Sequence, residues 1–110
     1  MDKETSSKLQ ELQILERNLQ SYMAQKQNFQ LELSESDNAL EEIKKTDSDI
    51  FKLVGQIMIK TDKEKTIKEL EEKKKLIELR ISSIEKQESL LENKATELKN
   101  QTKKLLESKK

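Results

Sequence analysis

The sequence predicts a mainly α fold: a long antiparallel coiled-coil hairpin with a short β-hairpin between its two helices that joins an oligomeric β-barrel platform. Three observations predict it. Apolar residues recur every three or four positions over two stretches of nearly equal length, which is typical of helices that bury one seam. Between them, the segment from Ile50 to Lys60 alternates as a strand does and is centred on Gly55, the only glycine. No proline interrupts either stretch.

The first helix is expected at about residues 5–45. A seven-residue repeat sustained over this length predicts helices that pack in a left-handed supercoil, and not one surface helix on a globular body. The ten seam positions, of which eight are apolar, are Leu12, Leu15, Leu19, Tyr22, Lys26, Phe29, Leu33, Ser36, Leu40 and Ile43.

The middle segment is expected to form the β-hairpin at about residues 50–60, with Gly55 in the turn. A lone two-stranded hairpin is marginal in water, and this one would expose seven apolar side chains and two unpaired edges. Hairpins from several chains should therefore join into a closed sheet or barrel. The predicted oligomerisation residues are Ile50, Phe51, Leu53, Val54, Gly55, Ile57, Met58 and Ile59. The alternatives are a helical continuation, an apolar loop between the arms, or one continuous helix.

The second helix is expected at about residues 62–108, because Thr61 to Glu64 fits a capping box in which the threonine hydroxyl caps the helix. Folding the chain back at Gly55 pairs residues whose numbers sum to about 110. The second helix has twelve seam positions, of which nine are apolar. They are Ile67, Leu70, Lys74, Ile77, Ile81, Ile84, Glu88, Leu91, Ala95, Leu98, Thr102 and Leu105.

This register makes most polar seam residues face a polar-capable residue of the other arm. Ser36 falls beside Lys74, Tyr22 beside Glu88, and Lys8 beside Thr102. Lys26 is the exception because it falls beside Ile84. Matched polar interruptions favour this register, since an isolated polar seam residue costs free energy.

Charge and composition bound the function. Residues 1–49 carry six basic and eleven acidic groups and residues 50–110 carry sixteen and eleven, so the arms should attract each other although the chain is neutral. A neutral chain lacks the basic footprint of a nucleic-acid binder. Without histidine or cysteine the commonest catalytic and metal-binding groups are missing, so we expect no enzyme, no metal and no cofactor.

The sequence also bears on location. No apolar run approaches the roughly 20 residues that span a bilayer, and residues 1–4 lack the features of a signal peptide. We therefore expect a cytoplasmic protein without a membrane partner.

Five segments, in their order and spacing, resemble the beta class of prefoldin subunits, especially the short archaeal-type form. They are residues 39–43 (ALEEI), 50–55 (IFKLVG), 63–65 (KEK), 78–81 (ELRI) and 85–88 (EKQE). The strand-glycine element between two long heptad arms, followed by ELRI, is the most specific part, and the layout covers nearly the whole chain. Residues 1–110 are accordingly read as a single prefoldin-like domain.

The resemblance implies a hexamer of two alpha-class and four beta-class subunits, whose hairpins build a double β-barrel platform that carries six coiled coils. It further implies an ATP-independent molecular (co-)chaperone that holds unfolded client polypeptides at the coiled-coil tips, prevents aggregation and delivers the clients to a group II chaperonin. Two departures stand out. The linker at residues 45–49 lacks the proline often found there, and Lys74 stands where an apolar residue is usual, which puts in doubt how tightly the helices pack near the hairpin.

The tip, where both chain termini lie, is the predicted client site. Its candidate residues are Leu9, Leu12, Ile14, Leu15, Leu98, Leu105 and Leu106, of which Leu9, Ile14 and Leu106 fall off the seam. We expect frayed tips to present them as adaptable apolar contacts for non-native chains. The alternative is that they are isolated exposed leucines, which are normal on a helix.

The carboxyl-terminal residues are basic: Lys99, Lys103, Lys104, Lys109 and Lys110. They could contact an acidic chaperonin surface or acidic substrates, although a solvated charge run at a helix end is the default. Outside the chaperone reading, the main rival is a structural coiled-coil adaptor whose hairpin mediates oligomerisation without binding clients.

Overall fold

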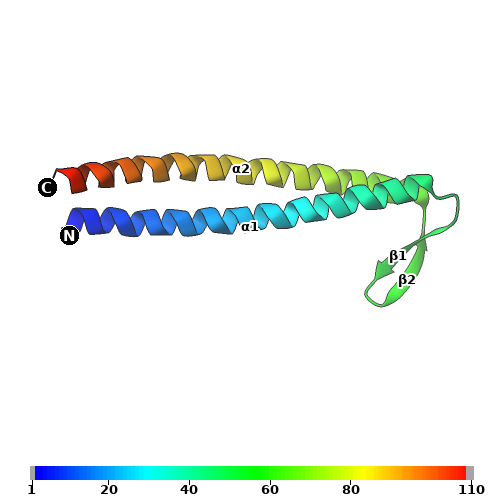
Figure 1. Cartoon of the computed structure of the whole chain (residues 1–110). Coiled ribbons are helices and arrows are strands. Elements are labelled where there is room, and N and C mark those ends of the chain that lie inside the picture. The colour runs from blue at the N-terminus through cyan, green and yellow to red at the C-terminus, as the bar shows by residue number, and fades with distance from the viewer. Residues whose placement is uncertain (1, 109–110) are drawn as a thin grey trace. The chain divides into compact units, whose positions relative to one another are not determined.

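The computed structural model describes residues 2–108 and has four elements in chain order (Figure 1). These are α1 (Lys3–Lys45), β1 (Ile50–Val54), β2 (Ile57–Thr61) and α2 (Lys63–Glu107). The predicted fold class, two long helices with an antiparallel β-hairpin between them, is confirmed. The single-helix and helical-continuation alternatives are wrong because residues 50–54 and 57–61 pair as strands.

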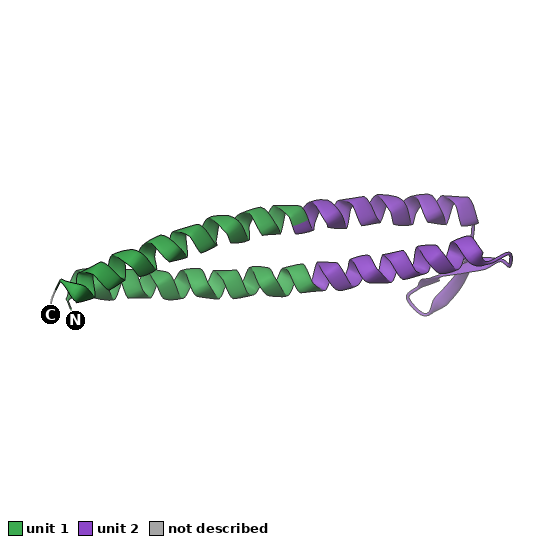
Figure 2. Cartoon of the chain, turned by 45° about the horizontal axis from the view of Figure 1, so that its top comes forward, with its two compact units in different colours: residues 1–27, 82–110 green, residues 28–81 purple. Residues whose placement is uncertain are grey.

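The chain divides into two compact units (Figure 2). Unit 1 consists of residues 1–27 and 82–110, and unit 2 of residues 28–81. Unit 1 holds the amino-terminal part of α1 and the carboxyl-terminal part of α2, which run antiparallel side by side. Unit 2 holds the remaining parts of both helices together with the hairpin.

Each helix begins after an aspartate. The amide of Thr5 donates to Asp2 Oδ1 at 2.9 Å, and the amide of Lys65 donates to Asp62 Oδ2 at 3.1 Å. The predicted threonine cap of the second helix is therefore wrong, and Asp62 is the cap. Thr61 is instead the last residue of β2, and its hydroxyl lies 3.1 Å from that of Thr66. A β-branched residue suits a strand, which left the next residue to cap the helix.

The seam of unit 1 is apolar in its middle. Leu15, Ala95 and Leu98 form a buried cluster, and Leu12 and Leu91 pack against it. In unit 2 the buried side chains include Leu40, Ile77 and Ser36. The heptad pattern thus places the core of each unit along the predicted seam.

Lys26 in unit 1 has a polar partner after all. Its ammonium donates to Glu88 Oε1 at 2.7 Å, and Glu88 is only 7% exposed. The sequence-based expectation that Lys26 faces only Ile84 is wrong, because a long lysine side chain reaches the next seam layer. The hydrogen bond to Glu88 raises the pKa of Lys26.

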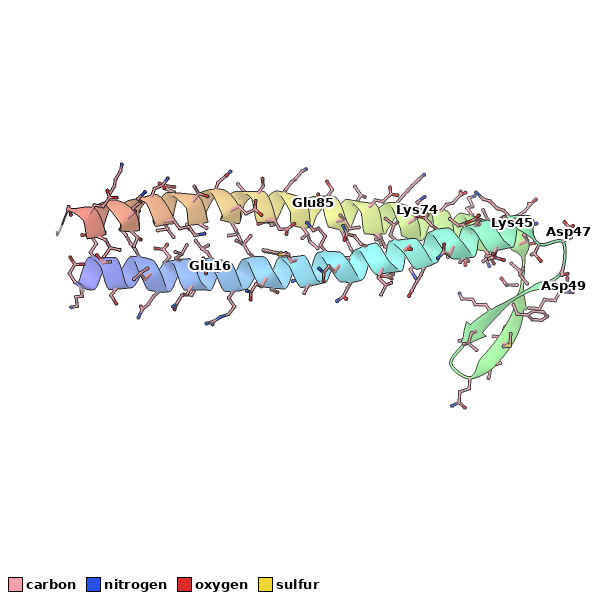
Figure 3. All side chains as sticks on the ribbon, in the orientation of Figure 1. Glu16, Lys45, Asp47, Asp49, Lys74 and Glu85 are labelled. Carbon is pink, nitrogen blue, oxygen red and sulfur yellow. The ribbon has the colours of Figure 1, made fainter. Side chains whose placement is uncertain are left out.

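Lys8 and Lys74 also find partners close to the predicted register. Lys8 donates to Gln101 Oε1 at 2.8 Å, one residue from the predicted Thr102. Lys74, labelled in Figure 3, binds Asp37 at 2.8 Å, one residue from Ser36. This hydrogen bond raises the pKa of Lys74. Lys74 is thereby accommodated at an apolar position by reaching outward to a carboxylate.

Weaker ion pairs also join the two arms within each unit. Lys99 lies 3.8 Å from Glu16 in unit 1, and Lys73 lies 3.5 Å from Glu32 in unit 2. These groups are exposed, so each pair contributes little on its own. In the same stretch of unit 2, the Arg80 guanidinium stands 5.7 Å from the centre of the Phe29 ring. Across residues 2–108, neither helix is long and apolar enough to cross a membrane.

Candidate interaction sites

The hairpin in unit 2 turns through two residues, Gly55 and Gln56. Gly55 has φ of 62°, and no other residue in the described chain has a positive φ. A glycine at the first central position followed by a residue with negative φ is the pattern of a type II′ turn, whose twist matches that of paired strands. The turn fixes the register, in which Val54 pairs with Ile57 and Leu53 with Met58.

The predicted oligomerisation residues lie on both faces of this hairpin. Directly opposed residues share a face, so Phe51, Leu53, Met58 and Lys60 point to one side. The other side carries Ile50, Lys52, Val54, Ile57, Ile59 and Thr61. Except for Ile50, which is half-buried, the predicted apolar residues are 50–68% exposed.

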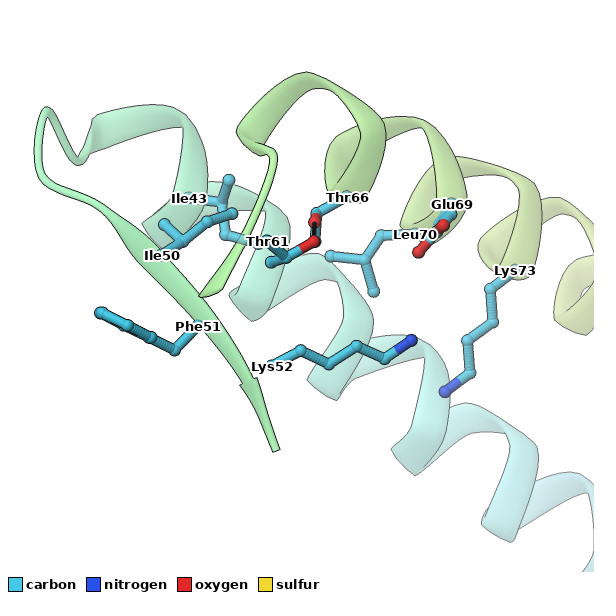
Figure 4. Close-up of a pocket in the computed structure, with 9 residues that line it drawn as sticks. All are labelled: Ile43, Ile50, Phe51, Lys52, Thr61, Thr66, Glu69, Leu70 and Lys73. Carbon is cyan, nitrogen blue, oxygen red and sulfur yellow. Dashed lines mark hydrogen bonds between the residues drawn. The ribbon is translucent and has the colours of Figure 1, made fainter. Parts of the chain in front are cut away.

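A cavity of about 580 Å³ separates the hairpin from the helices of unit 2 (Figure 4). Its apolar lining comes from Ile43 of α1, Ile50 of β1 and Leu70 of α2. Lys52 reaches from β1 toward the helices, and Lys73 of α2 also lines the space (Figure 4). Phe51 of β1 is a further lining residue, although its ring points away from the helices (Figure 4). The lining is thus partly apolar and partly charged, with Glu69 beside the two lysines.

The tip residues predicted to bind clients fall into three classes in unit 1. Leu15 and Leu98 are buried, Leu9, Leu12 and Leu105 are half-buried, and Ile14 and Leu106 are exposed. The helices remain intact to Lys3 and Glu107, so the tip is not frayed in this structure. Leu15 and Leu98 belong to the core, and only separation of the helices would make them available.

Polar side chains occupy buried positions near the end of the seam in unit 1. Thr5 is 1% exposed and Thr102 is 6% exposed, and neither hydroxyl has a hydrogen-bond partner within the described chain. A buried polar group without a partner costs about 1–3 kcal/mol. Thr102 was recognisable as a polar residue at a seam position, whereas Thr5 lies outside the seam that the sequence defined.

Thr102 also lines a groove of about 470 Å³ at the tip. Leu12 of α1 and Leu106 of α2 supply its apolar surface, and Lys99, Lys103 and Glu107 complete the lining. This groove brings together two of the predicted tip leucines and two of the basic residues. Lys109 and Lys110, which completed the predicted basic run, lie outside the described residues.

Further exposed leucines lie away from both sites. They are Leu31, Leu76, Leu79 and Leu90, each of which is more than half exposed within residues 2–108. Among residues 2–108, no three histidine, cysteine, aspartate or glutamate side chains are grouped so as to hold a metal ion. The hairpin and the tip groove are therefore the two candidate interaction sites.

Comparison with known proteins agrees with this architecture. Residues 6–109 match the family described as "Prefoldin subunit". The prefoldin subunit beta of Thermococcus onnurineus is 44% identical over 92 residues, which cover 82% of this chain and 79% of the relative. That of Caldivirga maquilingensis is 36% identical over 100 residues, covering 89% and 83%.

A solved structure is similar over nearly its full length. The crystal structure of the prefoldin beta subunit from Thermococcus strain KS-1 superposes with a TM-score of 0.88 at 36% sequence identity, covering 96% of this chain and 94% of that one. The family match spans both helices and the hairpin between them. The chain therefore belongs to the prefoldin subunit family.

Proposed function

We propose that this chain is a beta-class subunit of a hexamer with two alpha-class and four beta-class subunits. In that assembly it holds unfolded polypeptides at its tip without ATP, prevents their aggregation and delivers them to a group II chaperonin. Residues 1–110 act as one prefoldin-like domain. A cytoplasmic location and the absence of nucleic-acid and membrane partners stay predictions.

Part of this function follows from the family. Prefoldin subunits are non-enzymatic chaperones, so the chain is a chaperone subunit and not an enzyme. The beta family forms hetero-oligomers with alpha subunits. The stoichiometry, the client site and the chaperonin partner form the proposed part.

The hairpin is the observation that carries the proposal. Six of its large apolar side chains are at least half exposed, and its sheet has only two strands within the described chain. Each outer strand edge thus keeps unpaired backbone groups that a neighbouring strand can complete. Burying a large apolar side chain stabilises an interface by roughly 1.5–3 kcal/mol, so a barrel shared with other subunits would stabilise this segment substantially.

Client binding at the tip is supported by its mixed lining. Ile14 and Leu106 are exposed, and Leu12 and Leu106 line a groove that is open to solvent. Thr5 and Thr102 weaken the end of the seam because their buried hydroxyls have no partner within the described residues. An end that separates at low cost would expose further leucines to polypeptides of varied sequence.

The test is an aggregation assay. A chemically denatured client is diluted into buffer with this chain, with its cognate alpha subunit, or with both, and light scattering is followed without nucleotide. We expect strong suppression only with both subunits. An adaptor that oligomerises without binding clients would form the assembly yet leave scattering unchanged.

A matched pair of variants tests the place of binding. Substituting Ile14 and Leu106 by serine should reduce suppression while the mass of the assembly stays that of the wild type. The control substitutes Leu79 and Leu90 by serine; these leucines are more exposed than Ile14 and Leu106 but do not line the groove. If the control loses as much activity as the tip variant, the tip is not the client site.

A further inference from the structure

The tip groove has a composition that selects among clients. Leu12, Thr102 and Leu106 form an apolar strip with one hydroxyl, and Lys99 and Lys103 stand beside it against a single carboxylate, Glu107. The groove therefore offers an apolar contact bordered by excess positive charge. A uniformly apolar surface would bind any apolar client segment, whereas this groove distinguishes client segments by the charges of the residues beside their apolar side chain.

The two lysines are free to pair with a ligand. Lys103 is exposed and has no carboxylate partner within the part of the chain that is described. Lys99 is held only by Glu16 at 3.8 Å, and both side chains are more than half exposed. An exposed pair at this distance contributes little, so a client carboxylate can replace Glu16 at low cost.

The buried hydroxyl of Thr102 is a second feature of the groove. Thr102 is 6% exposed and its Oγ1 atom has no partner among the described residues. A peptide backbone offers both amide donors and carbonyl acceptors, and either can satisfy this hydroxyl once the groove widens. The threonine thus favours an extended peptide over a purely hydrocarbon ligand.

We infer that this groove binds client segments in which an apolar side chain is flanked by aspartate or glutamate. The apolar side chain packs between Leu12 and Leu106, and the flanking carboxylate pairs with Lys103 or Lys99. This inference rests on the proposed client binding at the tip and adds the class of segment that is bound.

The test uses the full assembly with the cognate alpha subunit and fluorescently labelled peptides. The peptides share one apolar core and differ only in its flanks, which are two glutamates, two glutamines or two lysines on each side. Fluorescence anisotropy should give the tightest binding for the glutamate-flanked peptide, by about two- to fivefold over the glutamine-flanked one at low salt. The preference should vanish at 1 M salt, where the screening length is about 3 Å.

Variants tie the preference to the groove. The double variant Lys99→Gln and Lys103→Gln should bind the glutamate- and glutamine-flanked peptides equally. The control, Lys86→Gln and Lys94→Gln, removes the same charge from exposed lysines of α2 outside the groove and should keep the preference. Equal binding of all three peptides by the wild type, or an equal loss in the control, would overturn the inference.

Three outcomes distinguish a failure of this inference from a failure of the proposed function. If the wild type suppresses aggregation but shows no charge preference, client binding stands and the selectivity is wrong. If it neither binds peptides nor suppresses aggregation, the proposed function itself fails. If the Lys99 and Lys103 variant keeps its peptide preference but loses affinity for the chaperonin, the lysines serve that partner and the inference is overturned.

Discussion

The hairpin and the tip handle apolar side chains in opposite ways. In the hairpin, six large apolar residues are 50–68% exposed on strands whose register is fixed by a two-residue turn. At the tip, Leu15 and Leu98 are buried, while the hydroxyls of Thr5 and Thr102, which have no partner among residues 2–108, weaken the seam around them. A rigid exposed surface suits one constant partner. A weakly closed seam suits many partners, because it can adapt.

The largest effect should come from the hairpin. Substituting the opposed residues Leu53 and Met58 by serine should weaken assembly with the alpha subunit by at least a hundredfold, since roughly 3 kcal/mol or more of apolar burial is lost. Native mass spectrometry measures the assembled fraction. The control Gln56→Ser changes an exposed turn residue and should assemble normally. Normal assembly of the double variant would show that the hairpin is not the interface.

The next effect concerns the seam of unit 1. Substituting Glu88 by leucine leaves Lys26 without its partner and should lower the Tm by roughly 5 °C or more. Adding Lys26→Met should restore most of the loss, because a matched apolar pair replaces a broken ionic one. Calorimetry of the assembled protein measures both variants. Equal Tm values for the single variant and the wild type would mean that the pair is not coupled to stability.

The same pair sets a dependence on pH. Because the pKa of Lys26 is raised in the folded chain, its stabilising contribution is complete below the ordinary lysine pKa of 10.5 and is lost as the pH rises through the higher folded value. The difference in Tm between the wild type and a Lys26→Met variant should therefore be constant near neutral pH. It should shrink only above about pH 10.5.

A smaller effect is expected at the turn. Gly55→Ala should destabilise the hairpin by about 1–2 kcal/mol because φ of 62° is costly for residues with a Cβ atom. Steric overlap is not the reason, since an added Cβ would meet nothing within 4 Å. Thermal unfolding of the assembly measures the change, and Gly55→Asn should lose less. An equal loss for both variants would point to a cause other than the backbone angle.

The smallest effect should be a gain. Thr102→Val removes a buried hydroxyl that has no partner in the described part of the chain and should stabilise the tip by about 1 kcal/mol. Hydrogen exchange of the last turns of α2 should slow, and aggregation suppression should fall because the tip opens less often. The control Thr96→Val alters a threonine whose hydroxyl already donates to the Glu92 carbonyl at 2.9 Å. Slower exchange with unchanged suppression would separate tip opening from client binding.

The elements of the fold were predictable from the sequence because each has its own period. The heptads placed Leu40, Ile77 and Leu98 on the buried seam, and the alternating segment with Gly55 predicted the hairpin. Both signals are patterns of apolar side chains whose period is set by the local backbone, so one sequence suffices to read them.

Side-chain partners were less predictable, because a period gives the face of a helix and not the reach of a side chain. The predicted register, in which paired residue numbers sum to about 110, put Lys26 beside Ile84, yet the lysine side chain extends to Glu88. The helix cap was predicted at Thr61, whereas Asp62 caps the helix, because Thr61 pairs with Ile50 in the sheet and the capping pattern does not reveal strand pairing. For the tip, the heptads marked Leu15 and Leu98 as seam residues and placed Ile14 and Leu106 off the seam, where both are exposed, but they did not show that off-seam Leu9 would be half-buried.

The alternation of side chains between the two faces of the hairpin constrains how this chain can change in length. Its opposed pairs keep Leu53 and Met58 on one side and Val54 and Ile57 on the other. Inserting one residue into either strand would turn every following side chain to the opposite side. Viable insertions within the strands should therefore add two residues at a time, whereas the helical arms should tolerate insertions of seven residues. Length differences among homologous chains should fall into these two classes.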